Sequence, residues 1–540
     1  MQKPSQLSLE SRAAIAALLL DQNQKLGAST ETLANIDRLK AGANAVVTGQ
    51  QVGLFGGPLL TLLKAATAVR AAADASRAGH PHVAIFWLAT EDHDLAEIDH
   101  AIFPVKIPRA ATNHNELVPH NPATQTIACH PTSQNRDVGH PEFSSQEDAG
   151  LRTLRLETPR TYAVPVGGLP LGEGILPLLD EMQTLLGDGP GYELLAACYR
   201  PDATYAEALG KLLLHVFARH GLIVIDAAAR SFHALTRPVL HAAITQAASL
   251  RAALQQRTRE LESAGYAAQV LVAASSSLLF LLDETTGARE ALKQPGENQW
   301  KAGGRSYSTA DLLQILDAAP ERLSPNALLR PVMQDALLPT SVYIGGPAEI
   351  AYFAQSQVVY QHIVGRVTPI MPRLSATLLE PEIAHLLTRY GVEWPQLLQQ
   401  SQLLQQTESL AQWLGARFMP VDGKRKLAAT GEALDHELTA LTSWMESLDA
   451  GLGGSAKTAA SKMRYQMNRL RRLAANFELQ RTPALRRHAA TMRQRLYPNG
   501  HLQERVLSAA WFLQADPETL ASLLVEAAND PLAGHRTICL

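Results

Sequence analysis

Cysteine is scarce in this 540-residue chain, which contains only Cys129, Cys198 and Cys539. No two of them form a CxxC pair, and an odd, sparse set is typical of a reducing compartment. A disulfide framework and a thiolate zinc site are therefore both disfavoured.

Charge is also low and nearly balanced, at 18% charged residues, with 48 basic against 51 acidic side chains and a net charge of −3. The whole molecule therefore has no electrostatic attraction to nucleic acid or to an anionic membrane. Long apolar runs are missing too, since the stretch from Ala13 to Leu20 is too short to cross a bilayer and has no small-residue cleavage site. We expect a cytoplasmic protein that has no membrane partner.

What is present is an α/β pattern. Residues 7–40 have helical spacing, and a β-branched run at 44–48 enters a glycine-rich turn that ends at Pro58. A Leu- and Ala-rich helix and the buried strand 83–89 follow, which together predict a right-handed βαβ unit and a parallel sheet. Further buried strands are expected at residues 221–226, 341–344 and 367–371.

Changes of composition divide the chain into a core, two insertions and a helical end. Polar and proline-rich residues mark the first insertion, and turn-rich antiparallel strands are predicted in the second. The predicted segments are 1–103 (N-terminal helices and first part of the core), 104–200 (first connecting insertion), 201–264 (core continued), 265–323 (second connecting insertion), 324–376 (core completed) and 377–540 (helical coiled-coil domain).

Strand signals disappear after about residue 375, and two apolar stripes follow. Their spacing of three and four residues predicts an antiparallel helical hairpin, with an ordinary bundle pair as the alternative. We expect the glycines of 451–455 to break the run between the two helices. The stripes are Leu434, Leu438, Leu441, Met445 and Leu448, then Met463, Met467, Leu470, Ala474 and Phe477.

The glycine-rich turn is the first candidate binding site. Glycines let backbone amides approach a ligand, and a helix start favours an anion, so the turn could bind a phosphate or a carboxylate. It matches neither a Walker loop nor GxGxxG, and a tight strand-to-helix turn explains it equally well. The candidate residues are Thr48, Gly49, Gln50, Gln51 and Gly53.

Glu91, Asp92, His93 and Asp94 directly follow a buried strand that contains Trp87. Ligands bind at the carboxyl ends of parallel strands, and three acids with an imidazole are costly to bury there without partners. We therefore name the four as catalytic candidates and Trp87 as a binding candidate. A capped helix start also explains the acids. Four adjacent residues cannot all point at one ion, so no metal site is predicted here.

A third group of candidates lies between residues 324 and 377. A strand, a glycine turn and a helix occur there again, with an acid in the first helical turn that could be a dipole partner or could point into the same crevice. An arginine after the next strand suits a carboxylate or a phosphate. The candidates are Asn326, Arg330, Gly345, Gly346, Glu349, Tyr352 and Arg373.

Residues 457–497 are strongly basic, with eleven Lys or Arg residues and Glu478 as the sole acid. Such a helix can hold RNA or nucleotide phosphates. More often it is a solvated face or pairs with acids on a neighbouring helix.

Five long blocks, in the same order along the chain, resemble the bacillithiol biosynthesis cysteine-adding enzyme family, and the likeness spans nearly the whole sequence. The blocks are TGQQVGLFGGP at 48–58, FWLATEDHDLAEIDH at 86–100, SPNALLRP at 324–331, YIGGPAEIAYF at 343–353 and LQERVLSAAWFL at 502–513.

This resemblance implies a Rossmann-like, nucleotidyltransferase-like core with two connecting modules, and a helical coiled-coil domain that forms a homodimer. It implies a ligase that joins the carboxyl group of cysteine to the amine of glucosaminyl-malate, the last step of bacillithiol synthesis, with ATP and its associated Mg for activation. The distant relatives, class I aminoacyl-tRNA synthetases and the mycothiol cysteine ligase, use HxGH and KMSKS signatures, and this chain has neither. A synthetase-like RNA- or nucleotide-binding protein without ligase activity is the alternative.

With this chemistry, the glycine turn would hold a phosphate or carboxylate, and His93 would stabilise charge or take the proton of the attacking amine. Glu349 would hold the amino group of cysteine, and Arg330 or Arg373 the malate carboxylates. All of these roles require the segments that begin at Thr48, Glu91 and Tyr343 to meet at one edge of the sheet.

Overall fold

The computed structural model describes residues 7–105, 150–158, 163–514, 516–530 and 532–540. About half of the predicted first insertion (106–149 and 159–162), as well as Cys129, lies outside the described residues. Within the described part of the chain, no helix is both long and apolar enough to cross a membrane.

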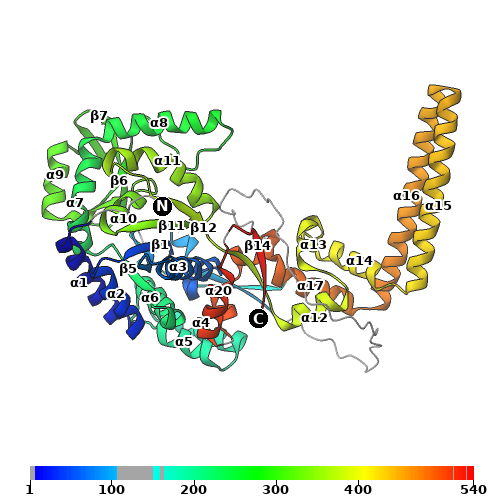
Figure 1. Ribbon diagram of the computed structural model, residues 1–540, viewed down its shortest axis with the longest axis horizontal. Helices are drawn as coiled ribbons and strands as arrows, with labels where there is room; N and C mark the ends of the chain where they lie inside the picture. The colour runs from blue at the N-terminus through cyan, green and yellow to red at the C-terminus, as the bar shows by residue number, and fades with distance from the viewer. Residues whose placement is uncertain (1–6, 106–149, 159–162, 515, 531) are drawn as a thin grey trace.

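The central sheet has five parallel strands in the order β12-β11-β1-β2-β5 (Figure 1). Numbered along the chain, this order is 3-2-1-4-5 from the β5 edge, so the direction of winding reverses between β1 and β11. The parallel α/β core predicted from the sequence is confirmed. The strands are β1 (Asn44–Gln51), β2 (His82–Ala89), β5 (Ile223–Asp226), β11 (Thr340–Gly345) and β12 (Ile370–Pro372).

Alternate residues of each strand enter two hydrophobic layers, which explains why the strands are apolar throughout. Val46 and Phe86 pack in one layer, whereas Val47, Ile85 and Trp87 pack in the other. The helices α3 (Leu60–Arg77) and α6 (Tyr205–Val216) cover the first layer. The second is covered by α1 (Leu9–Lys25), α2 (Thr30–Lys40), α7 (Arg230–Thr245), α8 (Ala247–Ser263), α10 (Arg330–Leu337) and α11 (Pro347–Ile363).

The predicted antiparallel module is confirmed as a second sheet in the order β10-β6-β7-β8-β9. Its strands are β6 (Ser276–Leu282), β7 (Arg289–Gly296), β8 (Gln299–Ala302), β9 (Arg305–Tyr307) and β10 (Leu323–Pro325), with α9 (Thr309–Ala318) packed beside them. A smaller pair joins β3 (His100–Pro104) to β4 (Leu151–Arg155), followed by α4 (Ile175–Leu186) and α5 (Pro190–Cys198). Short 3₁₀ turns are η1 (Leu54–Gly56), η2 (Leu95–Glu97), η3 (Ala218–His220), η4 (Pro320–Arg322), η5 (Ser401–Leu404) and η6 (Pro498–Gly500).

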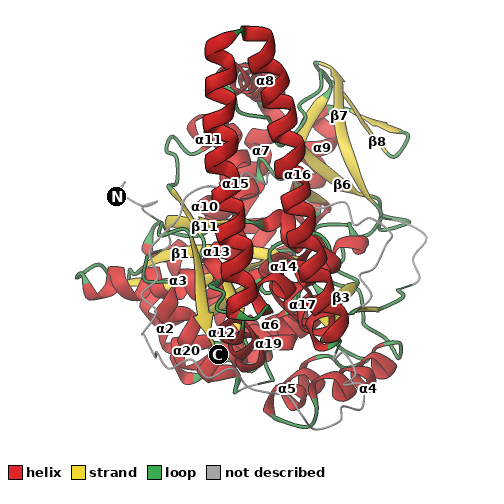
Figure 2. Cartoon of the chain, turned by 90° about the vertical axis from the view of Figure 1, so that its right-hand side faces the viewer, coloured by secondary structure: helices red, strands yellow, loops and turns green. Residues whose placement is uncertain are grey.

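The helical domain has its own core and carries a long hairpin that projects away from the rest of the molecule (Figures 1 and 2). The hairpin consists of α15 (Val421–Leu448) and α16 (Ala450–Arg481), as predicted. The helices that form the core are α12 (Pro381–Arg389), α13 (Trp394–Gln399), α14 (Thr407–Phe418) and α17 (Ala484–Leu496).

The predicted break at 451–455 is wrong, because these residues form the first turns of α16. Asp449 makes the turn instead, since its side chain caps α16 by accepting hydrogen bonds from the amides of Gly451 and Leu452. Gly453 is needed for close approach, because a Cβ there would lie 2.8 Å from Cβ of Glu446.

Half of the ten residues of the predicted apolar stripes are exposed in the single chain. Leu438 and Met467 are buried, but Leu441 is 51% exposed and Phe477 60% exposed. The exposed large apolar residues of the hairpin are Val421, Leu441, Trp444, Leu448, Leu452, Met463, Tyr465, Leu470, Leu473 and Phe477.

Several basic residues of 457–497 pair with acids. Lys457 contacts Glu446, and Arg464 contacts Asp435 across the hairpin. This pairing is what a solvated helix face requires and favours that interpretation over RNA binding.

The end of the chain returns to the α/β core, which the predicted division at residue 377 does not anticipate. β13 (Ser375–Leu379) and β14 (His535–Cys539) pair in parallel, so the prediction that strands end near 375 is wrong. The segment that contains α18 (Gln503–Val506), α19 (Ala509–Phe512) and α20 (Pro517–Ala527) inserts Leu507, Trp511 and Leu520 into the first layer of the core. β13 and β14 were not predicted because neither has a distinctive local sequence pattern. Each is stabilised by pairing with a segment that is distant in the sequence.

Glu504 joins this returning segment to the sheet. It is 1% exposed and accepts hydrogen bonds from Arg373 Nη2 at 2.7 Å, Ser375 Oγ at 3.0 Å and the Ala376 amide at 2.7 Å. Burial opposes its ionisation most strongly, but the Arg373 charge and these hydrogen bonds outweigh burial and lower the pKa of Glu504.

We predict that Glu504→Gln lowers the thermal unfolding midpoint at pH 7, because breaking a buried ion pair on one side typically costs about 3–5 kcal/mol. A lowered folded-state pKa means that the stabilisation is present above the ordinary glutamate pKa of about 4.3 and is lost as the pH falls through the folded value. The difference between the unfolding midpoints of the wild-type protein and Glu504→Gln, measured by calorimetry, should therefore shrink below about pH 4. Glu408→Gln, in an exposed pair with Arg486, is the control and should change the midpoint little. A pH-independent difference would contradict the prediction.

Candidate functional site

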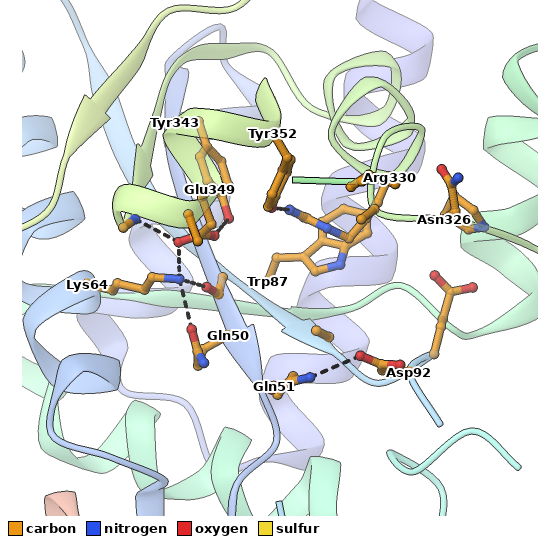
Figure 3. Close-up of a pocket in the computed structure, with 18 of the residues that line it drawn as sticks. Gln50, Gln51, Lys64, Trp87, Asp92, Asn326, Arg330, Tyr343, Glu349 and Tyr352 are labelled. Atoms are coloured by element: carbon orange, nitrogen blue, oxygen red, sulfur yellow. Dashed lines mark hydrogen bonds and ion pairs between the residues drawn. The ribbon is translucent and has the colours of Figure 1, made fainter. Parts of the chain in front are cut away.

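A cavity of about 560 Å³ opens at the carboxyl ends of the central strands, where the strand order reverses between β1 and β11. The segments that begin at Thr48, Glu91 and Tyr343 all contribute to it, so the predicted convergence at one edge of the sheet is confirmed. Figure 3 shows the lining side chains that come from these segments.

Lys64 and Glu349 form an ion pair across the crevice. Lys64 Nζ lies 2.5 Å from Glu349 Oε2, and the two side chains are 4% and 16% exposed. The same ammonium donates to the Gly49 carbonyl at 2.7 Å and to Gln50 Oε1 at 2.8 Å (Figure 3). An ammonium has three N–H donors, so these acceptors satisfy Lys64 completely. Lys64 therefore positions the end of β1 and is not available to a ligand.

Glu349 is equally well held. Its Oε1 accepts from the Tyr343 hydroxyl at 2.7 Å, and its Oε2 accepts from the Gly346 amide at 2.7 Å, which caps α11. Burial raises the pKa of Glu349 most, but Lys64 and these hydrogen bonds outweigh burial and lower it. Burial lowers the pKa of Lys64 despite the attraction of Glu349. The carboxylate stays ionised and fixes the first turn of α11.

The acid–histidine segment after β2 is held by a different partner at each residue. Glu91 Oε1 lies 3.0 Å from His233 Nε2 on α7, and Asp92 Oδ2 accepts from Gln51 Nε2 at 3.0 Å. His93 Nδ1 lies 3.2 Å from Arg289 Nη1.

Two pKa shifts follow from these contacts. Burial lowers the pKa of His233 most, but the hydrogen bond and charge of Glu91 reverse this and raise it. Burial raises the pKa of Asp92 most, but Gln51, the His93 amide and the Arg289 charge outweigh burial and lower it. Asp92 therefore faces the cavity as a carboxylate, with 37% of its side chain exposed.

Cationic side chains line the other parts of the cavity. Arg330 Nη2 donates to the Tyr352 hydroxyl at 3.0 Å, and its guanidinium lies 5.7 Å from the centre of the Tyr343 ring. Arg373 and Arg505 also line the cavity. Guanidinium groups next to carboxylates make a site for a ligand that has both anionic and cationic groups.

Several backbone amides of the glycine turn already donate hydrogen bonds within the protein. The N–H groups of Gly53, Leu54 and Gly57 donate to backbone carbonyls, and that of Gly56 donates to the Tyr199 hydroxyl at 2.7 Å. Gly49 has a packing role, because a Cβ there would lie 2.7 Å from the Trp87 carbonyl oxygen. These contacts agree with the tight-turn interpretation, and an anion in this cavity would have to contact side chains instead of the turn.

The structure brings most of the predicted site residues into one cavity. Those that line it are Gly49, Gln50, Gln51, Trp87, Glu91, Asp92, His93, Asn326, Arg330, Gly346, Glu349, Tyr352 and Arg373.

Four predicted residues are not among the lining residues. Thr48 is buried and its hydroxyl donates to the Ile344 carbonyl at 2.9 Å, which joins β1 to β11. Asp94 caps η2, as the helix-cap alternative predicted. Gly53 lies inside the turn, and the Gly345 carbonyl accepts from the Arg373 amide at 2.9 Å.

Four residues of the site were not predicted from the sequence. Lys64, Arg289 and Arg505 line the cavity, and His233 contacts Glu91 without lining the cavity itself. Lys64 is in an apolar helix, where a lone lysine is usually an exposed residue. Arg289 is in the inserted sheet and is distant in the sequence from the ends of the core strands. Arg505 stands in the resembling block 502–513, which was the available signal for it.

The predicted absence of a resident metal site stays a prediction, as do ATP and its Mg. Within the described ranges, no group of three or more His, Cys, Asp or Glu side chains is placed to hold a metal ion. The arginines of the cavity have the chemistry to hold nucleotide phosphates.

Comparison with known families agrees with the geometry. The N-terminal Rossmann-like domain of bacillithiol biosynthesis BshC matches residues 1–132 and 135–374, and its C-terminal coiled-coil domain matches residues 376–539.

Similar relatives carry the name "Putative cysteine ligase BshC". The protein of Koribacter versatilis is 39% identical over 98% of this chain and 90% of its own length. That of Solibacter usitatus is 33% identical over 98% and 90%, and that of Salinibacter ruber 31% over 98% and 88%. This chain therefore belongs to the bacillithiol biosynthesis BshC family.

Proposed function

We propose that this chain is a cysteine ligase that joins the carboxyl group of L-cysteine to the amine of glucosaminyl-malate, the last step of bacillithiol synthesis. The names of its relatives support the ligase class and cysteine as a substrate. The observation that carries the proposal is the cavity at the reversal of strand order, where carboxylates and arginines lie in one space.

The malate part of the substrate has two carboxylates, which we assign to Arg330 and Arg373. Guanidinium groups bind carboxylates through paired N–H donors, and partly buried pairs are strong because water does not screen them. Tyr352 fixes Arg330 and Glu504 fixes Arg373, so both cations are positioned before the substrate arrives.

The amino group of cysteine is a cation and suits the acidic side of the cavity. Glu349 was the expected partner, but its oxygens already accept from Tyr343, Gly346 and Lys64. Asp92, which faces the cavity as a carboxylate, is the better partner.

Amide formation from a free carboxylate expels water and needs an activating step, which we propose that ATP supplies. As the C–N bond forms, the amine must lose a proton and the acyl oxygen gains negative charge. His93 and Asp92 lie at the edge of the cavity where these changes can be stabilised. Arg505, a cavity arginine that is not assigned to malate, is the group that would contact phosphates, because the amides of Gly53, Leu54, Gly56 and Gly57 in the glycine turn are already bonded.

Two copies of the chain, we further propose, associate through the hairpin. Its exposed apolar residues, including Trp444 at 59% and Leu452 at 45% exposure, form a surface that a second hairpin would cover. Such a dimer would account for the stripe of apolar residues that the single chain leaves exposed.

The reaction can be tested directly. Purified protein, glucosaminyl-malate and cysteine are incubated with and without ATP and Mg, and the products are measured by mass spectrometry. We expect the mass of the cysteinyl amide to appear only with ATP. Absence of that product with ATP present would contradict the proposed function, and its formation without ATP would contradict the activation step.

Arg330→Met should raise KM for glucosaminyl-malate about 10- to 100-fold, because it removes a charge-assisted hydrogen bond to a carboxylate worth about 1.5–3 kcal/mol. KM for cysteine should change much less. Arg486→Met, an exposed arginine on α17, is the matched control. Equal increases in both KM values would remove the assignment of malate to Arg330.

The double substitution Trp444→Glu and Leu452→Glu should convert a dimer into a monomer, because it places charges in the apolar contact. Light scattering coupled to size-exclusion chromatography measures the mass. Leu271→Glu changes an apolar residue that is 90% exposed elsewhere and should leave the dimer intact. A wild-type chain that runs as a monomer, or a double variant that stays dimeric, would refute the hairpin interface.

A further inference from the structure

Arg289 is a fixed group that reaches the cavity from the inserted antiparallel sheet. Its side chain is 7% exposed, and its Nε donates to Ser324 Oγ at 3.0 Å and its Nη2 to the Pro325 carbonyl at 2.9 Å. The guanidinium carbon lies 3.8 Å from the centre of the Phe280 ring. These contacts all come from strands β6 and β10, so they fix both the position and the plane of the guanidinium.

The remaining terminal nitrogen of Arg289 points at a histidine. Its Nη1 lies 3.2 Å from His93 Nδ1. A guanidinium carries only N–H donors and does not lose its proton in proteins. Nδ1 of His93 must therefore be the acceptor in this contact, since a proton on Nδ1 would face the proton of Arg289.

Asp92 is the competing partner for His93 Nδ1. Its Oδ1 lies 3.5 Å from His93 Nδ1, but this oxygen already accepts from the His93 backbone amide at 2.8 Å. It also lies 3.8 Å from Arg289 Nη1, so the positive charge of Arg289 serves the carboxylate as well as the ring. The shorter contact and the lack of any acceptor on arginine decide in favour of Arg289.

We propose that Arg289 is a positioning residue that fixes His93 in the tautomer with its proton on Nε2, so that His93 acts as a hydrogen-bond donor in the reaction. This inference rests on the proposed function for the role of His93, although the tautomer itself does not. In this form the ring nitrogen that could take a proton from an amine is engaged by Arg289. The Nε2–H group instead stabilises negative charge that develops on the acyl oxygen as the C–N bond forms.

The tautomer is measured on the whole protein without substrate. Protein with ¹⁵N-labelled histidine is studied by long-range ¹H–¹⁵N NMR at pH 8, above the ordinary histidine pKa of about 6.5. Signals that disappear in His93→Gln identify the ring. We expect the nitrogen shift of an unprotonated nitrogen for Nδ1 and of a protonated one for Nε2. A proton on Nδ1 in the wild-type protein would overturn the proposal.

Arg289→Met tests the cause, because methionine fills similar space without a donor. We expect the fixed tautomer to be lost, with a protonated population appearing at Nδ1, and an unchanged spectrum in the folded variant would overturn the role of Arg289. If Arg289→Met does not fold, as judged by thermal unfolding, Arg289→Lys replaces it. The single, compact ammonium of lysine does not reproduce the guanidinium fork and should also release the ring.

The kcat values of two His93 variants distinguish a hydrogen-bond donor at this position from a base. The amide N–H of a glutamine can occupy the place of Nε2–H, whereas that of an asparagine occupies the place of Nδ1. We expect His93→Gln to keep at least ten times the kcat of His93→Asn, with KM values similar. Equal losses in the two variants would show a base and overturn the donor role. If the wild-type protein makes no cysteinyl amide, the proposed function fails while the NMR measurement still decides the tautomer.

Discussion

Lys64 and Glu349 stand on the helices that follow β1 and β11, the two strands between which the sheet reverses its winding. Their contact bridges the crevice that this reversal leaves open, and the same ammonium holds Gly49 and Gln50. Removing one partner would leave an uncompensated buried charge, which typically costs about 3–5 kcal/mol. The cavity has a defined shape because its two sides are joined by this pair.

The acidic side of the cavity is held by several separate contacts instead of one ion pair. Three consecutive residues are held by three separate elements: Glu91 by α7, Asp92 by β1 and His93 by the inserted sheet. A loop at the end of a strand would otherwise sample several conformations, and anchoring each side chain separately removes that freedom before a ligand binds. The inserted sheet is therefore part of the site, because Arg289 on β7 lines the cavity and holds His93.

The sequence predicted the features that depend on local pattern. Buried parallel strands are apolar along their whole length, and polar residues after such strands meet at one edge, so Asp92 and Glu349 were found. Lys64 and Arg289 were not found, because their roles arise from neighbours distant in the sequence. The hairpin turn was misplaced because Asp449 caps a helix there, while glycines that suggest a loop allow close packing of helices.

The first layer of the core takes Leu507, Trp511 and Leu520 from a segment that follows the hairpin. The ribosome must therefore synthesise the entire helical domain before the sheet can complete its apolar packing. Until then the nascent Rossmann-like domain exposes an unfilled apolar surface, which is the kind of intermediate that chaperones bind and that aggregates at high expression. A fragment cut at the boundary between the two family domains would keep this defect permanently.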